Sequence, residues 1–153
     1  MKKAEVWIDT GDDPERKMKA DLSSLIREDD NVQFKVTVQC LDPIAQVDKS
    51  VKALRRICKP LWSLVVWLGF NGLESIPDSI WELADNLEEL AIGYNKYKTI
   101  SPDIAKLKKL KKLLIGGNPF KDFPEAVCKL EQLELLYAYG CQLSARCFTE
   151  LHY

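Results

Sequence analysis

The sequence predicts an α/β fold, a solenoid with a curved parallel sheet on its concave side and short helices or turns on its convex side. Two observations support this prediction. In the second half of the chain one set of apolar positions recurs about every 23 residues, and in the first half short alternating stretches recur about every 30 residues. One coil of this length cannot bury its own apolar edge, so neighbouring coils must stack to form a core.

The shorter repeat is clearest around Asn95, and moving 23 residues on to Asn118 reproduces its apolar set. The two sets are Leu87, Leu90, Ile92, Tyr97, Ile100, Ile104 and Leu107, and then Leu110, Leu113, Ile115, Phe120, Phe123, Val127 and Leu130. Moving back to Asn71 gives another unit, and a last unit has Cys141 in the asparagine position. Agreement at so many positions indicates that one structural unit is repeated.

Each unit predicts a short strand, a turn at the asparagine and a short helix. Inward apolar residues of the strand alternate with outward residues, as a period of two requires. We expect the asparagine side chains to hydrogen-bond backbone groups of neighbouring coils, because turn backbone would otherwise be buried unpaired. Cys141 cannot do this well, so the ladder should weaken at the last coil. Pro77, Pro102 and Pro124 precede the helical pieces, where a missing N–H costs little.

The first part of the chain lacks the 23-residue pattern but keeps a strand phase. Alternating stretches centred on Trp7, Thr37 and Trp67 stand 30 residues apart. The predicted helices between them cover residues 17–27 and 44–58. Strand, helix and strand at this spacing predict right-handed crossovers and parallel pairing.

Two arrangements of this first part are compatible with the sequence. We expect residues 1–59 to be longer β-α units, atypical repeats that continue the solenoid as one six-stranded sheet. Residues 60–153 would then hold the leucine-containing repeats and a closing segment. In the alternative, residues 1–59 form a small α/β cap. Both arrangements would cover the hydrophobic end that a solenoid otherwise exposes.

The repeats resemble the leucine-rich-repeat family, whose pattern LxxLxLxxNxLxxIPxxIxxL is matched over about residues 63–145. The match is to the subclass with repeats of about 23 residues. This resemblance implies noncovalent recognition of another protein. The repeat type is common in adaptors, in host-directed bacterial effectors and in inhibitors or immunity proteins that block an enzyme, and the resemblance does not choose among them.

Composition narrows the functional classes further. The net charge is −1 and the pI is about 5.9, which argues against a general binder of nucleic acid or anionic membranes. The lysine-rich residues 106–112 are therefore interpreted as a solvated turn. The start lacks the apolar stretch of a secretory signal, and no run approaches membrane-spanning length. Five cysteines without CxxC spacing favour reduced thiols, so we expect a soluble, cytoplasmic protein.

Residue patterns that carry out catalysis are mostly absent. His152 is the only histidine and lies next to the end of the sequence, which argues against a histidine-based triad or metal cluster. No phosphate-binding glycine motif occurs. Residues 8–11, Ile-Asp-Thr-Gly, resemble the loop of aspartic proteases but have no second copy, so we interpret them as a polar loop after a strand. We predict that the protein is not an enzyme and needs no cofactor or metal.

The outward strand positions carry the functional information. The middle column reads Trp7, Thr37, Trp67, Ala91, Leu114 and Tyr137, which is unusually apolar for a solvated face. Gly69, Gly93 and Gly116 run beside it and would let a ligand approach the sheet closely. Exposed apolar patches and aromatic residues mark partner surfaces. The predicted protein-binding residues are Trp67, Phe70, Glu89, Tyr94, Lys112, Leu114, Leu135, Tyr137 and Tyr139, with Glu89 and Lys112 setting orientation.

Three occupants of this face are considered. We favour a partner protein of unknown identity. The alternative function is structural self-assembly, in which the same face forms a homodimer. A third possibility is ordinary packing, in which the N-terminal segment covers the aromatic residues or a register shifted by one residue turns them into core.

Overall fold

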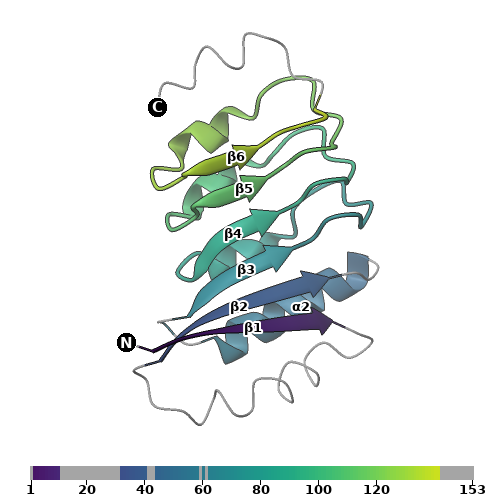
Figure 1. Cartoon of the computed structure of the whole chain (residues 1–153). Helices are drawn as coiled ribbons and strands as arrows, with labels where there is room; N and C mark the ends of the chain where they lie inside the picture. The colour runs from purple at the N-terminus through teal and green to yellow at the C-terminus, as the bar shows by residue number, and fades with distance from the viewer. Residues whose placement is uncertain (1, 11–31, 41–43, 59, 61, 142–153) are drawn as a thin grey trace.

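Six parallel strands form one sheet in the order of the chain (Figure 1). The computed structural model describes residues 2–10, 32–40, 44–58, 60 and 62–141. The strands are β1 (Lys2–Thr10), β2 (Val32–Cys40), β3 (Ser63–Trp67), β4 (Leu87–Ala91), β5 (Lys112–Leu114) and β6 (Leu135–Tyr137). All neighbouring pairs are parallel, so the predicted parallel sheet is confirmed. The division of the chain into residues 1–59 and 60–153 stays a prediction.

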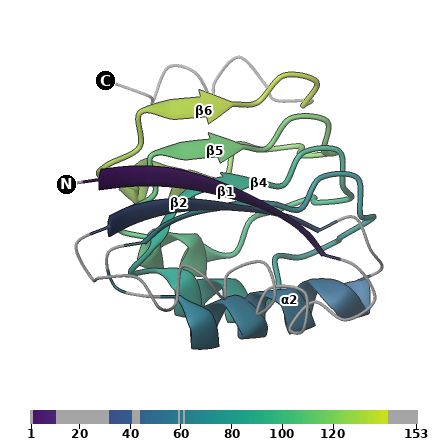
Figure 2. The same cartoon turned by 60° about the horizontal axis from the view of Figure 1, so that its bottom comes forward.

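The helices lie together on one side of this sheet, as Figure 2 shows. They are α2 (Ile44–Ile57), η1 (Asp78–Leu83), η2 (Pro102–Lys106) and η3 (Glu125–Lys129). The helix predicted at residues 44–58 is therefore confirmed as α2, whereas the one predicted at residues 17–27 lies outside the described residues. The architecture has two layers, and the helices leave the other face of β3 to β6 uncovered.

The three short helices are 3-10 helices that follow the predicted proline positions. Pro77 and Pro124 directly precede η1 and η3, and Pro102 is the first residue of η2. Such short connections suit the tighter 3-10 geometry, which is rarely used in longer runs. Each helix turns one apolar side toward the sheet, and the buried residues include Ile80, Ile104 and Val127.

The core fills the space between the sheet and the helices. Its sheet side consists of the inward positions of the strands and of the residues that follow them. These residues are Val36, Val38, Leu64, Val66, Leu68, Leu90, Ile92, Leu113 and Ile115, all fully buried. The strand alternation that buries these side chains points the intervening side chains to the opposite, concave face.

The asparagine side chains form the predicted ladder along the turns. Asn95 Oδ1 accepts hydrogen bonds from the N–H groups of Asn71 at 2.9 Å and Leu73 at 3.1 Å. Its Nδ2 donates to the carbonyl oxygens of Leu68 and Ile92, both at 2.9 Å. It also donates to the Gly93 carbonyl oxygen at 3.2 Å. One side chain thus joins two coils through five backbone groups, which confirms the expected role of the repeated asparagine.

The ladder continues at Asn118 and changes at Cys141. Asn118 Oδ1 accepts from the N–H groups of Asn95 at 3.1 Å and Tyr97 at 3.2 Å. The Cys141 thiol instead donates to the Ile115 carbonyl oxygen at 3.3 Å. A thiol is a weak donor and a weak acceptor, whereas a carboxamide is strong in both roles. The ladder therefore weakens at this coil, as predicted.

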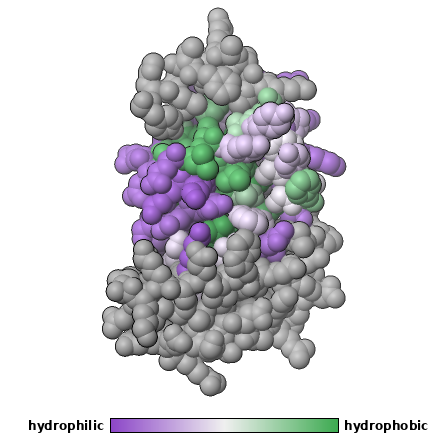
Figure 3. Space-filling model, viewed as in Figure 1, coloured by the Kyte–Doolittle hydropathy of each residue, from purple (hydrophilic) through white to green (hydrophobic). Residues whose placement is uncertain are grey.

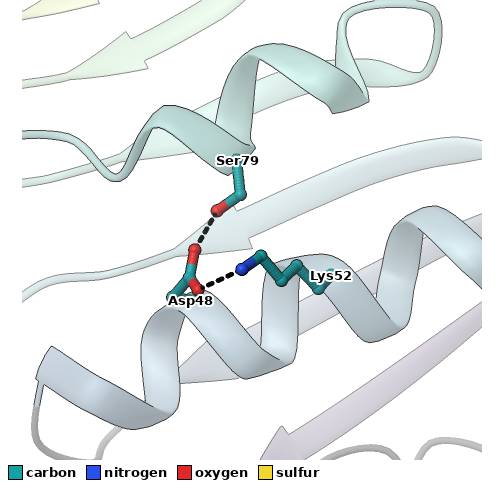
Figure 4. Close-up of polar contacts among 3 residues, drawn as sticks. All are labelled: Asp48, Lys52 and Ser79. Carbon is teal, nitrogen blue, oxygen red and sulfur yellow. Dashed lines mark hydrogen bonds and ion pairs between the residues drawn. The ribbon is translucent and has the colours of Figure 1, made fainter.

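A polar junction ties α2 to the first 3-10 helix (Figure 4). The Ser79 hydroxyl on η1 donates to Asp48 Oδ1 on α2 at 2.8 Å, and Lys52 Nζ lies 2.9 Å from Asp48 Oδ2. Hydrogen bonds from Lys52 and Ser79 lower the pKa of the Asp48 carboxyl. This junction connects the long crossover helix to the repeats by a side-chain bond in addition to apolar packing.

None of the helices in the described segments combines the length and the apolar character needed to cross a membrane.

Candidate functional site

The concave face of β3 to β6 divides into a hydrophilic side and an apolar side. Figure 3 shows hydrophilic side chains where these strands begin, and apolar and aromatic side chains over the middle of the face and where the strands end. This division follows from the outward residues themselves, because each of these strands ends in an outward residue that is apolar or aromatic. These four residues are Trp67, Ala91, Leu114 and Tyr137.

A groove of about 370 Å³ crosses the apolar side of the face, and we call it the concave groove. It is lined by Gln39, Trp67, Gly69, Phe70, Ala91, Gly93, Tyr94, Leu114, Gly116 and Tyr137. None of these lining residues is charged, although 29% of the sequence is. The lining includes five of the predicted binding residues, namely Trp67, Phe70, Tyr94, Leu114 and Tyr137.

The other four predicted residues, Glu89, Lys112, Leu135 and Tyr139, are not part of the groove lining. Glu89 accepts a hydrogen bond from Trp67 Nε1 at 3.3 Å, so it helps to hold the indole that lines the groove. In the register of β4 and β5, Glu89 pairs with Lys112, which is exposed. The Tyr139 ring lies 6.4 Å from the Tyr137 ring.

The concave face differs from the rest of the described chain in its exposed large apolar and aromatic residues. Five large apolar or aromatic residues are exposed there, with exposed fractions between 46% and 77%. All five belong to the predicted binding set: Phe70, Tyr94, Leu135, Tyr137 and Tyr139. Their exposure excludes the reading in which a register shifted by one residue places them in the core.

The open part of the face is smaller than the sequence predicted. Thr37 and Val65 occupy outward positions and pair in the register of β2 and β3, but both are buried. The expected middle column was therefore wrong at β2, because Gln39 and not Thr37 pairs with Trp67, and Thr37 is not solvated. The Trp7 side chain lies outside what the structure describes. The groove consequently reaches β2 only at Gln39, beyond the buried pair.

Phe70 and Tyr94 have an unusual backbone conformation. Their φ angles are 60° and 54°, in the left-handed region that favours glycine. The equivalent residues of the following coils are Gly117 and Gly140, with φ of 71° and 74°. The Phe70 and Tyr94 rings stack with centroids 4.6 Å apart and an interplanar angle of 4°. We call these two residues the aromatic pair.

The glycine column has a different primary role from the one expected. A Cβ at Gly69, Gly93 or Gly116 would lie 3.2, 3.0 or 2.7 Å from a carbonyl oxygen of the neighbouring coil. These glycines are therefore needed first for the close approach of successive coils. They also line the groove, so the approach of a ligand to them remains a prediction.

Gln39 and Ala91 are the lining residues that sequence reasoning left out of the predicted site. Both stand at outward strand positions, so the same alternation that selected Trp67 and Leu114 could have selected them. They were missed because neither is a large apolar, an aromatic or a charged residue. Within the described residues no group of His, Cys, Asp and Glu could hold a metal ion. The arrangement is suited to noncovalent contact with an apolar ligand surface.

Comparisons with known proteins identify similar folds. No protein-family model and no curated protein matches the sequence. A solved leucine-rich-repeat protein of Leptospira interrogans matches 72% of this chain with a TM-score of 0.52 and 20% identity. An internalin of Listeria monocytogenes matches 96% of it with a TM-score of 0.47 and 23% identity. The matches cover 26% and 37% of those two chains, so this chain spans a minor part of their length.

Proposed function

Since the chain has the leucine-rich-repeat fold, we propose that it is a noncatalytic interaction module that binds a partner protein in the concave groove. One observation carries this proposal. Every large apolar residue that is exposed in the described part of the chain lies on, or next to, one face of the sheet. A contiguous apolar surface of this kind is unfavourable in water unless another surface covers it.

The composition of the groove supports a protein partner. Tryptophan and tyrosine are enriched among the residues that dominate binding energy in protein interfaces, and such residues cluster near the interface centre. The groove lining contains residues of both types, Trp67 and Tyr137. Leu114 lies between Ala91 and Tyr137 in the register of the sheet. A charge-free centre with Glu89 and Lys112 beside it matches the usual division into an apolar core and a polar rim.

The rigid position of the groove supports useful affinity. Its residues sit on strands and on the turns directly after them, and Glu89 holds the Trp67 indole. Ordering of side chains on binding costs about 0.5–1.5 kcal/mol for each mobile side chain, and a preformed surface avoids part of this. We place the interaction in the cytoplasm, where thiols stay reduced, because the five cysteines lack a disulfide or zinc-binding pattern.

Affinity capture from the lysate of the source cell tests this function. The Leu114→Glu, Tyr137→Glu double variant places two charges in the groove and should lose the partner. The matched control is Thr99→Glu with Gln132→Glu, which adds the same charge at exposed positions outside the groove lining. Circular dichroism and melting curves must show that both variants are folded.

Three outcomes are informative. A protein captured by the wild type and the control but not by the groove variant supports the proposal. Equal capture by all three proteins contradicts it. Static light scattering tests the homodimer alternative, because a dimer that the groove variant disrupts would assign the same face to self-assembly.

A further inference from the structure

The three asparagines of the ladder differ in the residue that follows them. These following residues are Gly72, Lys96 and Pro119. The backbone nitrogen of the next residue can attack the side-chain carbonyl carbon of an asparagine, so the next residue decides whether this reaction can occur. Gly72 has no Cβ to hinder the approach, whereas Pro119 has no N–H proton to lose. Asn71 therefore has the most reactive sequence of the three.

The backbone nitrogen of Gly72 is also available for this attack. In the described part of the chain, no hydrogen bond engages the Gly72 N–H group. The Lys96 N–H group, which follows Asn95, donates to the Leu73 carbonyl oxygen at 2.7 Å. A bonded N–H group must lose its acceptor before it can react, which costs free energy. A Cβ at Gly72 would meet nothing beyond its chain neighbours within 4 Å, so the approach is open.

The side chain of Asn71 is more accessible than those of the next two coils. Asn95 and Asn118 are 7% and 2% exposed, and the amide of each makes five hydrogen bonds to backbone groups. Asn71 and Gly72 are only half-buried. Water can therefore reach this position, and the side chain can rotate with a smaller loss of buried contacts.

We infer that Asn71 is a site of spontaneous deamidation that the fold leaves open, whereas the fold protects Asn95 and Asn118. The Gly72 nitrogen bonds to the Asn71 side-chain carbonyl carbon, and the C–N bond of the carboxamide breaks. The departing amino group takes up the proton that the Gly72 nitrogen loses and leaves as ammonia. Water then adds to either carbonyl carbon of the cyclic imide and opens it to aspartate or isoaspartate. Asparagine and water are thus converted to an acid and ammonia, with no enzyme and no oxidant.

The product lacks a donor that the turn after β3 uses. Asn71 Nδ2 donates to the Leu68 carbonyl oxygen at 3.0 Å, whereas an ionised carboxylate only accepts hydrogen bonds and would repel this oxygen. Isoaspartate also adds one atom to the main chain directly after Phe70, which lines the concave groove. Deamidation should therefore destabilise the turn that holds one end of the groove.

Storage of the folded protein at mildly alkaline pH, followed by peptide mapping with mass spectrometry, tests the inference. The proteins are the wild type and Lys96→Gly, which creates a second asparagine–glycine sequence at Asn95. Lys96 is exposed, so this variant should fold, and circular dichroism checks it. The same proteins stored in concentrated urea give the rates that the sequence alone allows.

In the folded wild type, Asn71 should deamidate at least about tenfold faster than Asn95, because the buried amide must first break hydrogen bonds. In folded Lys96→Gly, Asn95 should stay at least about tenfold slower than Asn71, and the two rates should become similar in urea. Equal rates at these two positions in the folded variant would overturn the inference. An Asn71 that reacts in urea but not in the folded protein would overturn it as well.

The effect on the turn is measured with Asn71→Asp, which carries the carboxylate of the product. Its midpoint in urea unfolding should lie below that of the wild type at neutral pH. The difference should shrink in acid, because a protonated carboxyl can donate to the Leu68 carbonyl oxygen again. A midpoint equal to that of the wild type would contradict the expected destabilisation. The reaction needs no partner, so these results do not depend on what the concave groove binds.

Discussion

At the scale of single residues, the asparagine ladder concentrates several backbone contacts on one side chain. Asn95 is 7% exposed, and its amide contacts five backbone groups in two coils. Removal of one partner from a buried hydrogen bond leaves the other partner desolvated, which costs more than the bond itself contributes. The ladder therefore stabilises the turns mainly by preventing unpaired backbone groups.

Replacement of Asn95 by alanine should lower the free energy of unfolding by about 1–3 kcal/mol, because the backbone N–H groups of Asn71 and Leu73 lose their acceptor. Urea unfolding followed by circular dichroism measures the change. Lys96→Ala at the exposed neighbouring position is the control and should leave the midpoint unchanged. An unchanged midpoint for Asn95→Ala would refute the energetic role of the ladder.

A buried tyrosine offers a second test at this scale. Tyr97 is fully buried, and its hydroxyl has no hydrogen-bond partner among the described residues. Burial also raises the pKa of this hydroxyl. Tyr97→Phe should raise the free energy of unfolding by about 1 kcal/mol, because a desolvated polar group is removed. Melting curves measure the change.

The next coil provides the reciprocal variant. Phe120 is fully buried at the position that Tyr97 occupies one coil earlier. Phe120→Tyr adds a buried hydroxyl and should lower the free energy of unfolding by about 1–3 kcal/mol. A destabilised Tyr97→Phe variant together with a stable Phe120→Tyr variant would show that these sites satisfy the hydroxyl.

At the scale of elements, the contact between α2 and η1 depends on the charge of Asp48. Its pKa is lowered by hydrogen bonds from Lys52 and Ser79, so the folded state favours the charged carboxylate. This contribution to stability is present above the ordinary pKa of about 3.9 and is lost as the pH falls through the lowered folded value. Ser79 is buried but the Asp48 side chain is 44% exposed, so solvent screens part of the interaction.

Ser79→Ala should therefore reduce stability by about 1 kcal/mol at neutral pH, and the difference from the wild type should shrink in acid. Urea unfolding at about pH 7 and about pH 3 measures both values. Ser75→Ala, at an exposed position in the preceding turn, is the control. A difference that is the same at both pH values would show that packing, not the bond to Asp48, accounts for the loss.

The repeat pattern predicted the elements more fully than the groove. The spacing of Asn71, Asn95 and Asn118 located the strands, the turns and the short helices, since each position is set by contacts that repeat from coil to coil. Burial of Thr37 and Val65 was not predicted, because strand alternation places a side chain on one face of the sheet but does not say what covers that face. The left-handed backbone of Phe70 and Tyr94 could have been predicted from the sequence, since the equivalent residues in the next coils are the glycines Gly117 and Gly140.

At the scale of the whole molecule, the hydrophilic side chains of the concave face and the proposed binding groove occupy different parts of that face. The net charge is −1, and hydrophilic side chains lie where the strands of the concave face begin (Figure 3). The groove lining includes no charged residue. Interactions between exposed charges weaken as salt is added, but burial of apolar surface does not depend on charge screening. Binding in the concave groove should therefore depend little on ionic strength.

The affinity for the partner should fall by less than about threefold when sodium chloride is raised from about 50 to about 500 mM. Isothermal titration calorimetry at several salt concentrations measures this dependence. A steep loss of affinity would instead indicate that a charged surface, such as the lysines of residues 106–112, carries the interaction.

The left-handed position after the glycine column recurs once in each coil, outside the core, and this makes the aromatic surface modular. A coil with glycine at this position has no side chain to expose, whereas a coil with an aromatic residue exposes a ring. A Cβ at Gly117 would collide with the Tyr94 ring, but at Gly140 its nearest contact is an ordinary 3.5 Å. The row of displayed rings could therefore be lengthened by substitution at Gly140, at the expense of backbone strain, and not at Gly117.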